Sequence, residues 1–288
     1  MPISHGCVTS LLAQKYWVDD LNPWVFQITS QLGLRWYNLA YILGILSGAM
    51  MFRLWIRRGR LKLALSLLPS LFCYAGVGVI LGARFGYFIL YQMKDLITQP
   101  VLTLDVLRGG MSSHGGICGL LMALWVFSKE HRIDFVSILD PAVVAGSIGV
   151  VFGRLGNFIN GELWGRPSLV PWAVIFPHAP LIDGTNVPRH PSQLYAAMLE
   201  GVVVFLAGTY SYSRNLKRGS TFAIVCITYG IGRFIDEFWR EPDWDQSVYF
   251  GWLTKGQLYT IPILVAGIVI LWLHGKQQQE RRLSMIVE

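Results

Sequence analysis

The chain has 288 residues, of which 53% are hydrophobic and only 14% are charged. Because soluble domains carry about 25% charged residues, this composition excludes an ordinary soluble protein and indicates an integral membrane protein. The net charge of +7 would also suit a protein that binds nucleic acid. The basic residues, however, cluster in short loops between apolar runs, which excludes nucleic acid as a partner and favours anionic membrane lipids.

Cysteine usage suggests neither disulfide nor metal chemistry. The four cysteines, Cys7, Cys73, Cys118 and Cys226, lie far apart without a CxxC pair, and three of them fall inside apolar segments. We interpret them as packing residues and expect no metal site. The first thirty residues lack the basic start and apolar core of a removable signal peptide, so the first membrane helix should act as the targeting signal.

Seven apolar windows along the chain are suited to cross a bilayer core of roughly 30 Å as helices. They are residues 34–52, 64–91, 115–128, 139–159, 192–212, 219–239 and 257–274. The third window is short and begins in the glycine-rich stretch GGMSSHGGICG, so part of it could instead form a re-entrant loop. The predicted fold class is an all-α polytopic membrane protein with about seven transmembrane helices.

The distribution of positive charge among the loops predicts the orientation. The loops at 53–62, 129–138 and 214–218 and the tail from 274 hold 13 Lys or Arg residues, against 8 in the longer alternate segments. Since cytoplasmic loops carry the excess of positive charge, the N-terminus is expected outside and the C-terminus in the cytoplasm.

This orientation divides the chain into three parts. They are an extracytoplasmic N-terminal arm at 1–33, a transmembrane domain at 34–274, which should carry the site, and a cytoplasmic tail at 275–288. Within the arm, the aromatic and acidic residues of Trp17–Phe26 suggest a segment that lies along the outer interface. Within the domain, the loop at about 160–191 contains several prolines and is expected to form a small extracytoplasmic cap.

Polar residues within the predicted spans lie at one depth. At a rise of 1.5 Å per residue, Arg154 lies roughly 20 Å beyond Pro141, and Arg233 lies roughly 20 Å beyond Gly219, both counted from the inner side. Other polar or aromatic residues fall on the same outer level: Trp36, Tyr37, Arg84, His114, Asn157, Asn160, Glu162 and His190. Because a buried arginine costs about 2.5–3.5 kcal/mol on insertion scales, this coincidence predicts one polar site open to the outer leaflet.

The arginines differ in the structural alternatives open to them. Arg84 lies close enough to the interface for its head group to snorkel to water. Arg233 could pair with Glu237 one turn later, but such a pair is worth only about 0.2–0.5 kcal/mol in water, so we favour a functional role. Arg154 has no carboxylate three or four residues away in its own helix. We therefore expect a bound anion as its partner.

The histidines and other buried residues are interpreted separately. His114 lies between a serine and two glycines, where backbone can approach a ligand closely, and it is a functional candidate. His190 precedes a proline at a predicted helix start, and we interpret it as structural. Glu200, deep in the fifth window, either pairs with a neighbouring helix or stays protonated. Several glycines are spaced for close helix packing: Gly44, Gly48, Gly76, Gly78, Gly82 and Gly86.

Five sequence blocks resemble the prolipoprotein diacylglyceryl transferase family. They are RGGMSSHGG (108–116), GRLGNFINGELWGR (153–166), RHPSQLY (189–195), YGIGRFIDEFWREPD (229–243) and GQLYTIP (256–262), and they run in the order of that family. The resemblance implies a plasma-membrane enzyme that transfers the diacylglyceryl group of phosphatidylglycerol to the lipobox cysteine thiol of prolipoprotein signal peptides. It also implies glycerol phosphate as by-product and no cofactor or metal.

Family residues can be carried over position by position. The resemblance implies catalytic roles for Tyr37, His114, Arg233 and Glu237, and lipid-binding roles for Arg154, Asn157, Glu162 and Gly165. Two positions depart from the family pattern. Asn38 stands where a glycine is usual, which is mild because asparagine tolerates left-handed geometry. Ala196 stands where a glutamate is usual, so any role of an acid there is in doubt.

The chemistry expected of these residues is displacement by a thiolate with a phosphate leaving group. Arg154 and Arg233 would offer planar forks to phosphate oxygens, while Asn157 and Tyr37 would add neutral hydrogen bonds. The base that takes the thiol proton stays open among His114, Tyr37, Glu237 and a phosphate oxygen.

Two other functions would also place arginines inside helices. A transporter of an anionic solute predicts polar residues that reach both membrane faces, whereas the inner halves of these spans carry almost none. A non-catalytic lipid-binding or assembly scaffold predicts buried charges that only join helices, so that substitution of Arg154 would abolish folding together with function.

Overall fold

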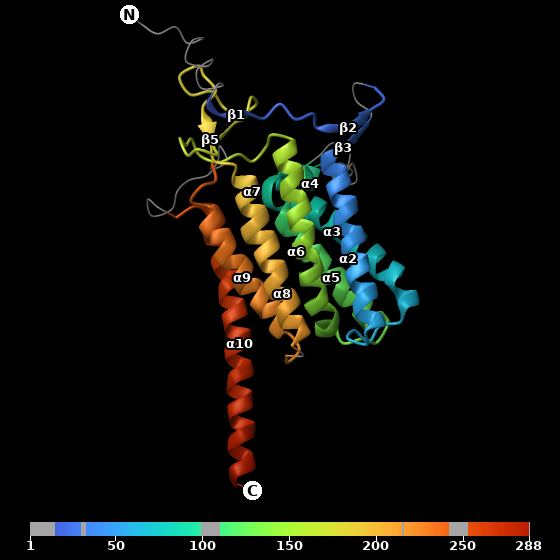
Figure 1. Ribbon diagram of the computed structural model, residues 1–288. Coiled ribbons are helices and arrows are strands. Elements are labelled where there is room, and N and C mark those ends of the chain that lie inside the picture. The colour runs from blue at the N-terminus through green and yellow to red at the C-terminus, as the bar shows by residue number, and fades with distance from the viewer. Residues whose placement is uncertain (1–14, 30–32, 99–109, 215, 242–252, 288) are drawn as a thin grey trace, which may run out of the picture. The chain divides into compact units, whose positions relative to one another are not determined.

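A computed structural model of the protein describes residues 15–29, 33–98, 110–214, 216–241 and 253–287. Most of this part of the chain is helical, and a few short strands are also present (Figure 1). The chain divides into two compact units, one made of Met1–Gly48 with Ala142–Glu288 and the other of Ala49–Pro141. The two boundaries fall inside helices α2 (Trp36–Arg57) and α6 (Phe135–Ile159).

Five helical stretches in the described residues are long and apolar enough to cross a membrane. They are Trp36–Arg57, Leu65–Ile89, Phe135–Ile159, Ser192–Ser213 and Gly256–Glu280. Each falls on a predicted window, so a polytopic helical membrane protein is confirmed. The remaining two windows hold the shorter helices α5 (Ser113–Glu130) and α9 (Ser220–Asp236). Helix α5 begins at Ser113 and is not among the five stretches long and apolar enough to cross a membrane, so the alternative of a re-entrant segment stays open.

In the unit Ala49–Pro141, helix α3 (Leu68–Tyr91) packs against α5 through glycine backbones. The facing positions are Gly78, Gly82, Gly86, Gly115 and Gly119. A Cβ added at Gly82 would lie 2.4 Å from the carbonyl oxygen of Gly115, so no larger residue fits without a shift. The predicted packing role is confirmed for the α3 glycines at 78, 82 and 86, whereas Gly76 has no such neighbour within 4 Å. The short helices η1 (Leu65–Leu67) and α4 (Met93–Thr98) flank α3.

The other unit contains the remaining long helices. Helices α7 (Ser192–Ala196), η4 (Ala197–Val202) and α8 (Val203–Ser213) follow one another without a break, and η4 is a π-helical turn. Helix α9 packs against this stretch on one side and against α10 (Lys255–Val287) on another. Helix α10 continues beyond residue 274, and in Figure 1 its C-terminal part extends past the ends of α8 and α9.

The predicted cap is an ordered structure built around a small sheet. Strand β1 (Trp17–Val18) pairs in parallel with β4 (Val174–Ile175), which pairs antiparallel with β5 (Pro188–Arg189). Two small apolar clusters each include one residue of β4. They contain Tyr16, Ala173 and Ile175 in one case and Val174, Phe176 and Ala179 in the other. The N-terminal arm therefore contributes a strand to the cap, which we refer to below as β1 together with residues 160–191.

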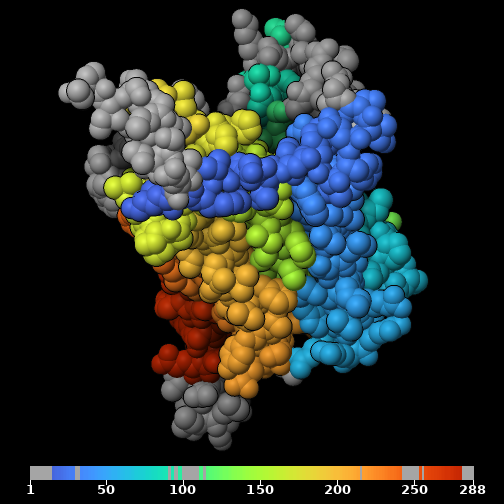
Figure 2. All heavy atoms as spheres, turned by 45° about the horizontal axis from the view of Figure 1, so that its top comes forward, coloured from blue at the N-terminus to red at the C-terminus, as the bar shows by residue number. Residues whose placement is uncertain are grey.

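A second strand pair lies between the cap and helix α2. Strands β2 (Trp24–Gln27) and β3 (Gly33–Arg35) are antiparallel, and the guanidinium of Arg35 lies 4.5 Å from the centre of the Trp24 ring. Figure 2 shows the arm, in blue, crossing from the cap to the start of α2. Its apolar side chains stay exposed, with Phe26 at 54% and Ile28 at 68% exposure, which suits a segment at a membrane interface.

Candidate functional site: a buried charge cluster

The central feature of the site is an ion pair between helices α6 and η4. The Nη2 atom of Arg154 lies 2.8 Å from Oε2 of Glu200, and the Glu200 side chain is only 1% exposed. An arginine and a carboxylate at this distance form a charge-assisted hydrogen bond, which is about twice as strong as a neutral one. The predicted pairing of Glu200 with a neighbouring helix is confirmed. A bound anion was expected as the partner of Arg154, and the structure instead supplies a carboxylate from another helix.

Arg233 of α9 faces the same carboxylate and two others. Its Nε atom lies 3.7 Å from Oε1 of Glu200, and its Nη1 atom lies 2.5 Å from Oε2 of Glu237 and 3.6 Å from Oδ2 of Asp236. The predicted intrahelical pair of Arg233 with Glu237 is thus present. We call the five residues Arg154, Glu200, Arg233, Asp236 and Glu237 the charge cluster.

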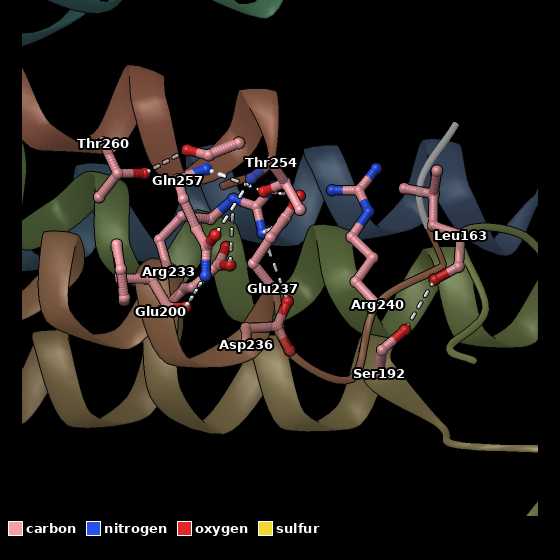
Figure 3. Close-up of polar contacts among 12 residues, drawn as sticks. Leu163, Ser192, Glu200, Arg233, Asp236, Glu237, Arg240, Thr254, Gln257 and Thr260 are labelled. Atoms are coloured by element: carbon pink, nitrogen blue, oxygen red, sulfur yellow. Dashed lines mark hydrogen bonds and ion pairs between the residues drawn. The ribbon is translucent and has the colours of Figure 1, made fainter. Parts of the chain in front are cut away.

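Glu237 is held in place from the start of α10. The Oγ1 atom of Thr254 donates a hydrogen bond to Oε1 of Glu237 at 2.9 Å, and Gln257 in turn accepts from the Thr254 backbone at 3.1 Å. Figure 3 shows these side chains converging from α9 and α10. Gly256 leaves room for the carboxylate, since a Cβ there would lie 2.5 Å from Oε1 of Glu237. The orientation of Glu237 is therefore fixed by hydrogen bonds and by the absence of a side chain at residue 256.

A second polar group adjoins the charge cluster one turn along α6. Asn157 donates through Nδ2 to Oε1 of Glu162 at 2.7 Å, and the side chain of Tyr37 interacts with both residues. The hydroxyl of Tyr37 also lies 2.7 Å from that of Tyr41. Gln193, 1% exposed, donates through Nε2 to the carbonyl oxygen of Glu162 at 2.7 Å. Because Asn157 follows Arg154 by three residues, both side chains lie on the same face of α6.

The cap begins directly after this group and packs through backbone. Gly165 donates its N–H to the carbonyl oxygen of His190 at 2.9 Å. A Cβ at Gly165 would lie 2.5 Å from that oxygen and 2.7 Å from the carbonyl oxygen of Trp239. The glycine is therefore required for close approach of three chain segments. His190 contacts the Tyr195 hydroxyl through Nδ1 at 3.2 Å, a geometry that fits its structural interpretation.

The site residues predicted for the first half of the chain are distributed between the two units. Tyr37 belongs to the unit of the charge cluster, whereas Arg84 and His114 belong to Ala49–Pro141. The backbone of His114 lies in the first turn of α5, and its side chain lies outside the described part of the structure. Snorkelling is wrong for Arg84. Its side chain is 4% exposed, donates to the carbonyl oxygen of Gly110 at 3.0 Å and lies over the Phe88 ring.

Sequence reasoning missed several members of the site. Asp236 and Thr254 received no role, and Glu200 was recognised only as a buried acid in need of a partner. Gln257 and Gly256 lie in a block that carried the family resemblance, yet neither was assigned a function. A usable signal was the run of Arg233, Asp236 and Glu237, since residues three and four apart share a helix face.

The arginines of the charge cluster already face its three carboxylates, so an anion that binds there competes with those acids. Arg154 and Arg233 face Glu200, Asp236 and Glu237, and Arg240 adds a further positive charge near Asp236. Both arginines keep guanidinium N–H groups that a second acceptor could use, because Arg has five donors in a planar fork. The arrangement thus suits phosphate or another oxyanion with oxygens divided between two helices.

The fold and the site together define a polytopic membrane protein with paired arginines buried between its helices. Comparison with known sequences identifies the family. The profile described as prolipoprotein diacylglyceryl transferase matches residues 23–273. The chain therefore belongs to the prolipoprotein diacylglyceryl transferase family and is a transferase.

Individual relatives cover most of the chain. A protein of Legionella pneumophila (strain Paris), named phosphatidylglycerol–prolipoprotein diacylglyceryl transferase, is 40% identical over 255 residues, or 88% of this chain and 97% of that protein. A protein of the same name from Nitratidesulfovibrio vulgaris (strain DSM 19637 / Miyazaki F) is 40% identical over 83% of this chain and 89% of its own length. One from Methylococcus capsulatus is 39% identical over 83% and 90%.

Proposed function

We propose that this protein transfers the diacylglyceryl group of phosphatidylglycerol to the thiol of the lipobox cysteine in prolipoproteins, the first step of bacterial lipoprotein maturation. The observation that carries the proposal, within this family, is the convergence of Arg154 and Arg233 from different helices on a single carboxylate. Two guanidiniums that can share one carboxylate can also share one phosphate.

The reaction is a displacement at the terminal glycerol carbon of the diacylglyceryl group. The cysteine sulfur forms the new C–S bond, the C–O bond to phosphate breaks, and glycerol phosphate leaves with the bonding electrons. Arg154 and Arg233 stabilise the charge that develops on the phosphate oxygens. Asn157 follows Arg154 by one helical turn and Tyr37 interacts with Asn157, so both can supply neutral donors, while Glu162 and Gly165 shape the adjoining turn.

The thiol must lose its proton before it attacks, since the thiolate is the nucleophile and an unperturbed thiol has a pKa of about 8.5. His114 is our first candidate for this base because of its residue type. Glu237 and Tyr37 are alternatives within the unit of the charge cluster, and a phosphate oxygen is a third. Replacement of each residue in turn, with the pH dependence of turnover as the readout, separates these assignments.

We further propose the placement of the protein in the cell. The seven helical windows span the bacterial inner membrane with the N-terminal arm outside, and the site opens towards the outer leaflet. In this arrangement the cap and the exposed apolar residues of β2 lie at the outer interface, and the chain from residue 275 onward is cytoplasmic. Neither phosphatidylglycerol nor the precursor then has to leave the membrane, because phosphate and cysteine meet at head-group depth.

The decisive experiment uses the purified protein with phosphatidylglycerol and a lipobox peptide. We expect mass spectrometry to detect the mass of a diacylglyceryl group on the cysteine, and glycerol phosphate in equal amount. A peptide with serine in place of cysteine is the matched control and should gain nothing. If correctly folded protein modifies no peptide but takes up an anionic solute into vesicles, the transferase proposal fails and the transporter alternative gains support.

A further inference from the structure

We propose that Glu200 is a positioning residue that takes the place of the substrate phosphate between Arg154 and Arg233, and releases both arginines to the lipid by taking up a proton. This inference rests on the proposed function, since it assumes a phospholipid phosphate as the ligand of the two arginines.

The geometry of Glu200 corresponds to that of a phosphodiester. Its Oε2 atom lies 2.8 Å from Arg154, and its Oε1 atom lies 3.7 Å from Arg233, so each oxygen faces a different helix. A phosphodiester likewise carries one negative charge shared by two free oxygens. In the absence of lipid, the carboxylate therefore holds both guanidiniums where a phosphate would need them, which keeps the site preorganised.

The contact of Glu200 with Arg233 is weaker than its contact with Arg154. Among the described residues, Oε1 of Glu200 has no hydrogen-bond partner although it is fully buried. At 3.7 Å the contact with Arg233 is an ion pair without a hydrogen bond, and Arg233 makes its shortest contact with Glu237 instead. A phosphate oxygen that enters between Arg233 and Glu200 would gain a donor without breaking a hydrogen bond there.

The backbone around Glu200 is also unusual. Residues Ala197–Val202 form a π-helical turn inside an otherwise α-helical span. Such turns are rare and occur frequently at functional sites. Gly201 sits tightly against α6, since a Cβ there would lie 2.5 Å from the Val151 side chain. The wide turn thus brings the Glu200 carboxylate to Arg154 while the helices stay in backbone contact.

The charges around Glu200 require a proton when lipid binds. The groups that face it are Arg154 from α6 and Tyr229, Arg233 and Asp236 from α9. A bound phosphate would add a fourth negative charge to the three carboxylates of the charge cluster. Only the two arginines of the cluster and the nearby Arg240 are positive, and like charges repel strongly in a buried site. Protonation of Glu200 removes the charge that competes most directly with the phosphate.

The test measures lipid binding and turnover separately as functions of pH, in wild-type protein and in Glu200→Gln. Wild type should take up about one proton per phosphatidylglycerol bound, and its KM for this lipid should rise by up to about tenfold per pH unit. Glu200→Gln should bind lipid more tightly at high pH and lose this dependence, because its neutral amide does not compete with the phosphate for the two arginines.

The control variants keep the inference open to refutation. Glu200→Asp keeps the charge on a shorter side chain, so it should retain the pH dependence of KM and lose kcat. Asp236→Asn should leave that dependence in place. The inference is overturned if Asp236→Asn rather than Glu200→Gln abolishes it, or if wild type binds lipid without proton uptake. The last measurement needs no variant, so misfolding cannot obscure it. If wild type does not transfer the diacylglyceryl group at all, the proposed function fails instead.

Discussion

Arg154 and Arg189 lie in the same unit of this protein, but they are held by different kinds of partner. Arg154 pairs with a carboxylate side chain, whereas Arg189 in the cap donates to the backbone carbonyl oxygens of Gly165 at 3.3 Å and Pro180 at 3.1 Å. Carbonyl oxygens are part of the chain and cannot leave. A carboxylate can turn away, take up a proton or be replaced by another anion, so of these two arginines Arg154 is the one available to a ligand.

The surroundings of the two arginines agree with this difference. The Arg189 side chain is 2% exposed, and its Nη1 atom lies 3.4 Å from Oε2 of Glu241, whose side chain is 37% exposed. Because solvent screens an exposed partner, this ion pair adds little to stability beyond the carbonyl contacts. The Glu200 partner of Arg154 is almost fully buried and also faces Arg233. Burial of an arginine alone therefore does not indicate a ligand-binding role. A partner that another anion can replace does indicate one.

Arg154→Lys should show the largest effect. Lysine keeps the charge but loses the planar fork that can bind two oxygens of one phosphate. We expect kcat/KM to fall about 100-fold or more, as for loss of one preorganised donor, in protein that stays folded. Peptide modification and thermal unfolding in detergent measure the two properties.

The matched control for this variant is Arg214→Lys, an exposed arginine whose guanidinium lies over the Tyr210 ring. It should change activity and stability only slightly. Full activity in Arg154→Lys would contradict bidentate binding of phosphate. Complete loss of folding would instead favour the scaffold interpretation, in which the buried charges only join helices.

Gly165→Ala should cost the most stability among the cap variants. Its new methyl group would meet two carbonyl oxygens at 2.5 and 2.7 Å, both belonging to backbone that has little freedom to move. We expect a loss of about 2–3 kcal/mol in the free energy of unfolding, the range of overpacked interiors. Gly146→Ala is the control, because a Cβ atom added there would meet no other part of the chain within 4 Å. If both variants had the same free energy of unfolding, the backbone of the cap would be able to shift and accommodate the added methyl group.

Arg189→Lys tests the other side of the comparison. A lysine can keep one carbonyl contact and the pair with Glu241, but it cannot reach Gly165 and Pro180 simultaneously in the same geometry. We expect stability to fall by about 1–2 kcal/mol, the cost of one lost buried hydrogen bond. Activity per folded molecule should fall far less than in Arg154→Lys. A larger loss of activity than of stability would mean that the cap arginine also serves the ligand.

The elements of the fold that depend on local sequence were predictable. Apolar runs of membrane length predicted a helix at every window, because a chain in lipid must satisfy its backbone hydrogen bonds within the segment. The pairing of Arg233 with Glu237 could also be recognised from local sequence, because the two residues lie one turn apart on one helix. The glycines of α3 predicted close packing, although their partners at Gly115 and Gly119 were not identified.

Contacts between distant segments were not predictable from the pattern. Arg154 and Glu200 are 46 residues apart, and their pairing depends on which faces α6 and η4 turn towards each other. The π-helical turn that presents Glu200 has no sequence signature comparable to a proline or a helix cap. Pairing of β1 with β4 likewise joins the arm to a loop more than 150 residues later. Snorkelling was predicted for Arg84 from its depth alone. The sequence did not reveal the carbonyl oxygen of Gly110, which accepts a hydrogen bond from this arginine.

The smallest effect expected concerns the response of the cap to pH. Burial lowers the pKa of His190 below its usual value of 6.5, so the folded cap binds fewer protons than the unfolded chain in mildly acidic solution. The contribution of His190 to stability should therefore be fully present above about pH 6.5 and decline as the pH falls below it.

A second group in the cap region complicates this response. Burial raises the pKa of Asp19, which changes stability with pH in the opposite direction. The informative quantity is thus the difference between wild type and His190→Asn, which should keep the Asp19 contribution and lose the decline. If both proteins lose the same stability between pH 7.5 and 5, His190 stays neutral or protonates without cost, and the acid response arises elsewhere.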